Sequence, residues 1–138
     1  MNDVKVIYWT MSGNTEAMAQ AVAKGAGTQA VNVADARAED LKDVKAFALG
    51  CPAMGDEVIE EGEMEPFVAE VEGLCAGKTV GLFGSYGWGD GQWMRDWVER
   101  MKNAGAVVVN DAGIIANGSA DDDTLAALEE MGRQLASL

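Results

Sequence analysis

The transition that decides the fold lies in residues 4–22, VKVIYWTMSGNTEAMAQAV. Residues 4–9 are almost continuously apolar, which predicts a β-strand that is buried on both faces. After the polar residues 10–15, apolar side chains recur at helical spacing, at Ala17, Met18, Ala21 and Val22. The segment therefore predicts a strand that leads through a polar loop into a helix.

The rest of the chain repeats this alternation. Apolar runs predict further strands over 30–33, 46–50 and 79–83, and one interrupted strand over 106–109 and 113–116. Helical patterns predict a first helix that ends near Gly25 and Gly27, a short helix over 38–43, and helices over 66–75, 93–101 and 121–135. Five apolar strands that alternate with helices predict an α/β fold, a doubly wound parallel sheet with helices on both faces. Ligands of such sheets bind beyond the carboxyl ends of the strands.

Composition and charge narrow the function further. The chain has 138 residues, 49% of them hydrophobic, which predicts a single domain over 1–138. Its net charge of −13 argues against binding to nucleic acid or to an anionic membrane. The absence of histidine excludes Ser-His-Asp and Cys-His catalysis, and with only two cysteines it also excludes the usual zinc sites. We therefore expect no metal site and no catalytic residues of the chain's own, and we expect the chemistry to belong to a bound cofactor.

The sequence also predicts a cytoplasmic location. No apolar run approaches the roughly 18 residues that a membrane span needs. Residues 1–3 offer no basic start to a signal peptide. Cys51 and Cys75 have no CxxC spacing, and we expect free thiols in a reducing compartment.

The loop after the first strand predicts an anion site. Residues 10–15 supply three hydroxyls and one amide side chain immediately before a helix, where backbone N–H groups bind phosphate. A nucleoside-triphosphate P-loop would need Gly-Lys-Ser/Thr here, whereas the next basic residue is Lys24. A plain helix N-cap is the alternative, but a cap needs only one such residue. We therefore predict a site for one terminal phosphate that is held by neutral donors.

The loops after the third and fourth strands predict a site for a planar ring. They cover residues 51–57 and 84–91, and the second is rich in glycine, which allows the backbone to approach a flat ligand closely. Trp88 stands alone among glycines and suits stacking on one ring face. Met54 is polarizable and suits the other. The alternatives are a surface tryptophan and a core methionine.

A planar ring with a single phosphate describes flavin mononucleotide (FMN), and the whole chain resembles the flavodoxins, specifically the short-chain type of anaerobic bacteria. The resemblance rests on Tyr8-Trp9 with residues 12–15, on residues 53–57 and on residues 84–91. It implies the strand order 2-1-3-4-5, FMN as cofactor, and a one-electron carrier rather than an enzyme. The net charge of −13 predicts a low potential for this carrier, and a monomer is the expectation for a shuttle. The cofactor-binding residues that it implies are Thr10, Met11, Ser12, Gly13, Asn14, Thr15, Pro52, Ala53, Met54, Gly55, Asp56, Glu57, Ser85, Tyr86, Gly87, Trp88 and Gly89.

The resemblance also implies individual roles. The hydroxyls of Thr10, Ser12 and Thr15 would hold the phosphate, and Met54 and Trp88 would flank the isoalloxazine ring. Glu57 would accept the flavin N3–H, the Gly55-Asp56 peptide would face N5, and backbone over 85–89 would contact the ribityl chain and the ring. Met11 and Pro52 depart from the family pattern, in which a small residue and a hydroxyl are common at these positions.

The acidic residues predict the kind of partner. Eight acids occur without any Lys or Arg between Lys45 and Lys78, at Asp56, Glu57, Glu60, Glu61, Glu63, Glu65, Glu70 and Glu72. A solvated face is the simplest reading of such a run. Because this run begins within a cofactor loop, we also expect it to guide docking to reductases and oxidoreductases with basic surfaces. An FMN-dependent enzyme similar to quinone reductases is the alternative function.

Overall fold

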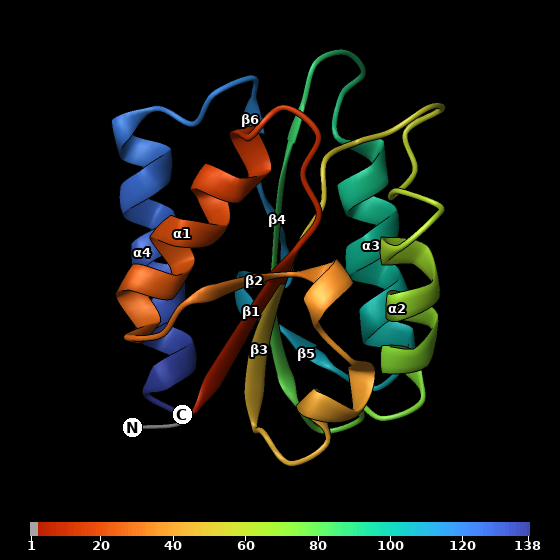
Figure 1. Ribbon diagram of the computed structural model, residues 1–138, viewed down its shortest axis with the longest axis vertical. Coiled ribbons are helices and arrows are strands. Elements are labelled where there is room, and N and C mark those ends of the chain that lie inside the picture. The colour runs from red at the N-terminus through yellow and green to blue at the C-terminus, as the bar shows by residue number, and fades with distance from the viewer. Residues whose placement is uncertain (1–2) are drawn as a thin grey trace.

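The computed structural model describes residues 3–138, and over this range the backbone forms one six-stranded sheet in which all the strand pairs are parallel. The strands are β1 (Val4–Tyr8), β2 (Ala30–Asn32), β3 (Ala46–Gly50), β4 (Thr79–Tyr86), β5 (Val107–Val108) and β6 (Ile114–Asn117). Their order is β2-β1-β3-β4-β5, and β6 also pairs with β4 (Figure 1). The predicted parallel sheet and its 2-1-3-4-5 order are confirmed.

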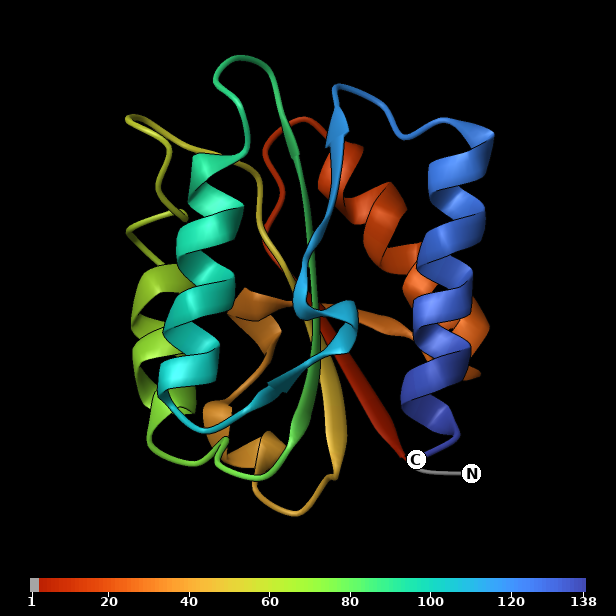
Figure 2. The same ribbon diagram turned by 180° about the vertical axis from the view of Figure 1, so that it is seen from behind.

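The sixth strand is the second half of the interrupted edge strand that the sequence predicts. β5 pairs with the start of β4 and β6 with its end, so both lie along the same neighbour. Between them the chain turns out of the sheet at Val109–Asp111, where Asn110 and Asp111 have positive φ values of 60° and 56°. Asn and Asp tolerate this conformation better than most residues. A break of this kind keeps an exposed sheet edge from pairing with another chain (Figure 2).

Two helices cover each face of the sheet. On one face lie α1 (Asn14–Ala26) and α4 (Asp122–Ala136), and on the other lie α2 (Met64–Glu72) and α3 (Gln92–Asn103) (Figure 1). Each pair seals its own apolar cluster against the strands, with Met18 and Leu128 in one cluster and Phe47 and Trp97 in the other. Asp121 caps α4 by accepting a hydrogen bond from the Thr124 N–H at 2.8 Å, which confirms the predicted acidic start of this helix.

Several predicted boundaries need correction. The strand expected over 79–83 continues to Tyr86, so residues 84–86 of the expected loop lie in β4, and the strand expected over 30–33 ends at Asn32. The short helix expected over 38–43 is a single 3-10 turn at Ala38–Leu41. The helix α2 begins at Met64 and ends at Glu72, before Leu74 and Cys75, so Pro66 still lies in the first turn, where its missing N–H removes no helical bond. Gly25 does not end α1, which continues to Ala26 and closes at Gly27 in the left-handed conformation (φ 73°).

Gly25 lies inside α1 because the neighbouring helix leaves no room for a side chain. A Cβ placed on Gly25 would lie 1.8 Å from the carbonyl oxygen of Glu129 in α4. A Cβ on Gly132 of α4 would in turn lie 2.0 Å from the carbonyl oxygen of Val22 in α1. The two backbones therefore approach each other at two glycines. From the sequence alone, a glycine at such a position is interpreted as the end of the helix.

We predict that Gly25→Ala destabilises the protein. Alanine favours a helix over glycine, but its methyl group would force the backbones of α1 and α4 apart, and overpacking of this kind costs about 1–3 kcal/mol. Urea unfolding followed by circular dichroism measures the effect. Gly73→Ala is the matched control, because its nearest atom lies at 3.5 Å, and it should change stability by less than about 0.5 kcal/mol. Equal stabilities for Gly25→Ala and the control would contradict the tight helix contact.

Candidate functional site

The carboxyl ends of β1, β3, β4 and β6 meet at one edge of the sheet, at the top of Figure 1. A cavity of about 200 Å³ opens there between the loops that follow these strands. Its lining consists of Thr10, Met11, Ser12, Asn14, Thr15, Pro52, Ala53, Met54, Ser85, Tyr86, Gly87 and Gly118. Six of the residues implied by the resemblance lie outside this lining: Gly13, Gly55, Asp56, Glu57, Trp88 and Gly89.

Gly118 belongs to the lining although the sequence analysis did not select it. It follows β6, and its N–H donates to the carbonyl oxygen of Tyr86 at 2.9 Å. The next residue, Ser119, donates its hydroxyl to the side-chain oxygen of Asn14 at 3.4 Å. The predicted parallel sheet could have indicated this loop, because the last parallel strand ends at the same edge as the others.

The loop after β1 has the features of an anion site. The hydroxyl oxygen of Thr10 accepts hydrogen bonds from the N–H groups of Gly13 (3.1 Å) and Glu16 (3.4 Å), which fixes the loop against the start of α1. The N-cap residue is Gly13 (φ 96°), and no side chain caps the helix from that position. Within residues 3–138, the N–H groups of Asn14 and Thr15 have no hydrogen-bond acceptor. Two free N–H groups at a helix start attract an anion.

None of the side chains in this lining is basic. Lys24, the next basic residue along the chain, lies in the last turn of α1 and forms a 3.6 Å ion pair with Glu129. An anion at the start of α1 would therefore be held by backbone N–H groups and hydroxyls alone.

Thr15 and Ser85 join the first loop to the end of β4. The Thr15 side chain is 1% exposed and Ser85 is 6% exposed. Their hydroxyl oxygens lie 3.1 Å apart, and the Ser85 N–H donates to the Thr15 hydroxyl oxygen at 3.3 Å. The start of α1 and the end of β4, which both contribute to the cavity lining, are thus joined by hydrogen bonds.

The structure brings Met54 to the cavity but leaves Trp88 outside. Met54 is half-buried in the lining, and its N–H and C=O groups exchange hydrogen bonds of 2.8 and 2.9 Å with Val58, which closes a tight loop. Gly55 (φ 50°) and Glu57 (φ 57°) both adopt the left-handed conformation within that loop. Trp88, by contrast, is 65% exposed at the tip of the loop after β4.

Glu57 connects the two ring loops. One of its carboxylate oxygens accepts a hydrogen bond from the Gly91 N–H at 3.2 Å. A Cβ on Gly89 would lie 2.6 Å from the Glu57 carboxyl, so the side chain lies directly against the loop after β4. Glu57 is a glutamate with positive φ, and this carboxylate contact offsets part of the conformational cost.

Part of the acidic run has a structural role. The Glu60 carboxylate accepts hydrogen bonds from the N–H groups of Gly62 (2.6 Å), Glu63 (2.7 Å) and Met64 (2.9 Å), and thereby caps the start of α2. Burial alone would raise the pKa of Glu60, but these three N–H groups stabilise its charged form and lower the pKa overall. Glu63 accepts a hydrogen bond from the Trp9 indole at 3.2 Å.

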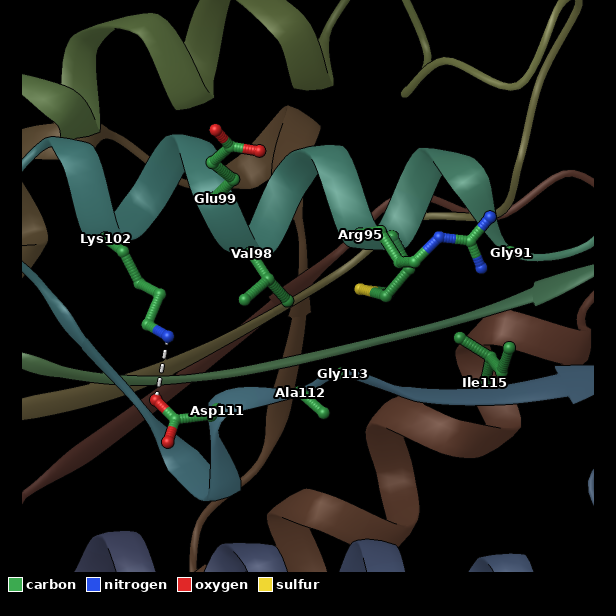
Figure 3. A pocket seen from close by; sticks show the side chains of 10 residues that line it. Gly91, Arg95, Val98, Glu99, Lys102, Asp111, Ala112, Gly113 and Ile115 are labelled. Carbon is green, nitrogen blue, oxygen red and sulfur yellow. Dashed lines mark ion pairs between the residues drawn. The ribbon is translucent and has the colours of Figure 1, made fainter.

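A second cavity, of about 360 Å³, lies between α3 and the segment Asp111–Ile115 (Figure 3). Figure 3 shows the Val98 side chain directed at this segment, and at one end Lys102 reaches Asp111 in an ion pair of 2.9 Å. The Arg95 guanidinium is held by Asp90 at 3.0 Å. Because these charges already have partners within the chain, this cavity offers less to an anionic ligand than the one at the carboxyl edge.

No group of three or more Cys, Asp or Glu side chains within residues 3–138 is arranged to hold a metal ion.

We predict that Glu60→Gln lowers stability by about 1 kcal/mol at pH 7, the usual cost of losing a helix cap. The folded pKa of Glu60 lies below the unfolded value, so its carboxylate stabilises the fold above the unfolded pKa of about 4.3, and this stabilisation is lost as the pH falls through the folded pKa. The difference between wild type and variant should therefore shrink below about pH 4 in urea titrations. Glu61→Gln removes the same charge from an exposed neighbour and is the control. A pH-independent difference would contradict the capping role.

Known proteins resemble this chain over nearly its full length. The family model described as Flavodoxin matches residues 6–133. A flavodoxin of Clostridium beijerinckii is 44% identical over 142 residues, covering 98% of this chain and 100% of that protein. A flavodoxin of Megasphaera elsdenii is 43% identical over 114 residues, covering 79% of this chain and 83% of that protein. The solution structure of two-electron reduced Megasphaera elsdenii flavodoxin has a TM-score of 0.88 and 36% sequence identity, over 99% of this chain and 100% of that chain.

Proposed function

The chain belongs to the flavodoxin family, and we propose that its FMN lies at the cavity between the loops that follow β1, β3, β4 and β6. The protein is an FMN-binding electron carrier rather than an enzyme, and it exchanges electrons with redox partner proteins. Bound FMN supplies the reversible uptake and release of electrons, while the chain binds it, orients it and sets the charge around it. We propose that residues 1–138 act as one FMN-binding domain and that the carrier is a monomer.

The donors of the first loop fit the phosphate of FMN. The N–H groups of Asn14 and Thr15 lack an acceptor within the described residues, and Ser12 adds an exposed hydroxyl to the same lining. Thr10 uses its oxygen as an acceptor for two N–H groups and keeps its own proton to donate. This excess of donors over acceptors is the observation that carries the assignment.

The ring of FMN requires more room than this cavity gives. A volume of about 200 Å³ is below the roughly 300–1,000 Å³ of pockets that enclose a whole small molecule. We propose that the cavity takes the phosphate end and that the ring contacts the loops at its mouth, through Met54, Trp88 and Glu57. The exposed indole of Trp88 and the polarizable side chain of Met54 both suit a planar ring.

The surrounding charge makes the carrier a low-potential one. Reduction adds negative charge to the bound cofactor within a chain of net charge −13. One unit charge about 10 Å away costs about 0.4–1.7 kcal/mol for an effective dielectric constant of about 80–20. Each acid at such a distance from the ring, together with an uncompensated phosphate, would disfavour reduction, and a carrier reduced against this field gives up its electrons readily.

The first test is the cofactor and the need for a partner. The purified protein should be yellow and should release one FMN, rather than FAD, on acid treatment. It should take electrons from NADPH only when a flavodoxin reductase is added. Steady oxidation of NADPH by quinone with this protein alone would instead support the alternative, a quinone reductase. Colourless protein that FMN does not reconstitute would contradict the assignment.

We propose that exposed acids beside the ring loops guide docking to partners with basic surfaces. The structure corrects which acids are free to do so, because Glu60 caps α2 and Glu65 and Glu72 both pair with Arg100 at 2.6 Å. Asp56 and Glu61 are exposed, have no hydrogen bond or ion pair within residues 3–138, and lie in the segment that leads from the ring loop to α2.

The double variant Asp56→Lys/Glu61→Lys should slow electron transfer to ferricytochrome c, a protein with a basic surface, by about tenfold at low ionic strength, because charge steers association. Stopped-flow absorbance measures the rate. The effect should fall sharply near 1 M salt, where the screening length is about 3 Å. Asp43→Lys/Glu99→Lys makes the same change in net charge at exposed positions outside the lining of the proposed FMN cavity and should have a smaller effect. Equal rates for the two double variants would contradict a local docking surface.

We also propose that the protein works in the cytoplasm. Both cysteines are free thiols in the structure, and each is buried. Burial raises the pKa of Cys51 to about 12, so this thiol is unreactive at neutral pH. None of the helices described over residues 3–138 has the length and apolar character needed to cross a membrane.

A further inference from the structure

The two buried polar side chains of residues 3–138, Thr15 and Ser85, contact each other in the lining of the proposed cofactor cavity. Thr15 lies in the first turn of α1 and Ser85 near the end of β4, seventy positions apart in the sequence. Their hydroxyl oxygens are 3.1 Å apart, and the Ser85 N–H donates to the Thr15 oxygen at 3.3 Å. A buried hydroxyl needs an acceptor for its proton and donors for its oxygen, so each of the two hydroxyl protons must be assigned an acceptor.

The pair has one proton more than it can use internally. Each hydroxyl carries one proton, and a single hydrogen bond joins the two oxygens. If Thr15 is the donor in that bond, the Ser85 proton is left over. If Ser85 is the donor, the Thr15 oxygen accepts from both the hydroxyl and the N–H of Ser85, and the Thr15 proton is left over. In both cases one proton is left for an acceptor in the cavity that both residues line.

We propose that Ser85 is a positioning residue that makes Thr15 a dedicated phosphate donor, and that this pair gives the site its preference for phosphorylated over unphosphorylated flavin. The inference rests on the proposed FMN site. Thr15 is the partner next to the free N–H groups at the start of α1, where an anion is most stable. An anion there draws the Thr15 proton, and Ser85 must then donate to Thr15. Each bond in this chain polarises and strengthens the next.

The backbone of Ser85 is rigid enough for this role. Its carbonyl oxygen accepts from the Ala53 N–H at 3.0 Å, while its N–H is directed to Thr15. The preceding residue, Gly84, packs so closely that a Cβ there would lie 2.1 Å from the carbonyl oxygen of Cys51. Ser85 of β4 is therefore bonded through its backbone to the first turn of α1 and to the loop after β3, which restricts where its side chain begins. Preorganised donors bind an anion without the free-energy cost of reorienting the donor groups.

The experiment compares FMN with riboflavin, which lacks the phosphate. Dissociation constants are measured by quenching of flavin fluorescence for wild type, Ser85→Ala, Thr15→Val and the double variant. Ser85→Ala should weaken FMN binding by about tenfold, the loss expected for one hydrogen bond toward a charged group, and should leave riboflavin binding almost unchanged. In the Thr15→Val background, Ser85→Ala should cause no further loss that is specific to FMN. Thr15→Ser keeps the hydroxyl and should keep the preference for FMN.

Urea unfolding of the apoproteins identifies a variant that fails to fold, and Ser137→Ala, the same substitution at an exposed position outside the cavity lining, is the control. Equal losses for FMN and riboflavin in Ser85→Ala would overturn the proposal, because they would indicate a general packing role. FMN-specific losses that add in the double variant would also overturn it, because the residues would then act independently. If the wild type binds no FMN, the proposed function itself fails, which is a different result from failure of the Ser85 pair.

Discussion

Parallel pairing of the central strands is the constraint on which the rest of the structure depends. In register, Tyr8 lies beside Gly50 and Gly50 beside Phe83, which is the level at which β1 and β3 end. β4 and β6 continue side by side from there and end at the paired residues Tyr86 and Asn117, so all four strands end toward the same edge of the sheet. Gly50 is required there, because a Cβ at this position would lie 2.0 Å from the Phe83 ring. Each loop that leaves this edge then begins within reach of the others. Loops far apart in sequence form one cavity for this reason alone.

Local patterns were sufficient to predict the elements and most of the cavity. A few adjacent residues are enough to identify each continuously apolar strand, the polar loop over 10–15 and the break in the edge strand. What failed depends on contacts that the residue types alone do not reveal. In the sequence Gly25 has the pattern of a helix end, whereas in the structure it lies inside α1 because α4 leaves no room for a side chain there. In the sequence Glu60 has the pattern of a surface acid, whereas in the structure its carboxylate accepts hydrogen bonds from the N–H groups of Gly62, Glu63 and Met64 at the start of α2.

The acids of the run between Lys45 and Lys78 have two different roles, because some stabilise the fold and others contribute only negative charge. Glu60, Glu65 and Glu72 hold the fold together, through a helix cap in one case and through the guanidinium of Arg100 in the others. Asp56 and Glu61, which are exposed and have no hydrogen bond or ion pair within residues 3–138, contribute only to the field, which is long-ranged at low salt and screened at high salt. Counting charges in the sequence cannot separate these groups, because a paired carboxylate and a free one have the same composition. Hydrogen-bond geometry separates them.

The neutral anion site and the acidic chain support each other. A lysine or arginine at the start of α1 would bind a phosphate more tightly, but it would also cancel part of the negative field at the neighbouring ring loops. In the proposed site, backbone N–H groups and the hydroxyls of Thr10 and Thr15 would direct partial charges at the anion and leave the net charge unchanged. Binding of the phosphate and the field at the ring are therefore set by different atoms. Because they are separate, a cofactor can be held firmly in surroundings that still disfavour its reduction.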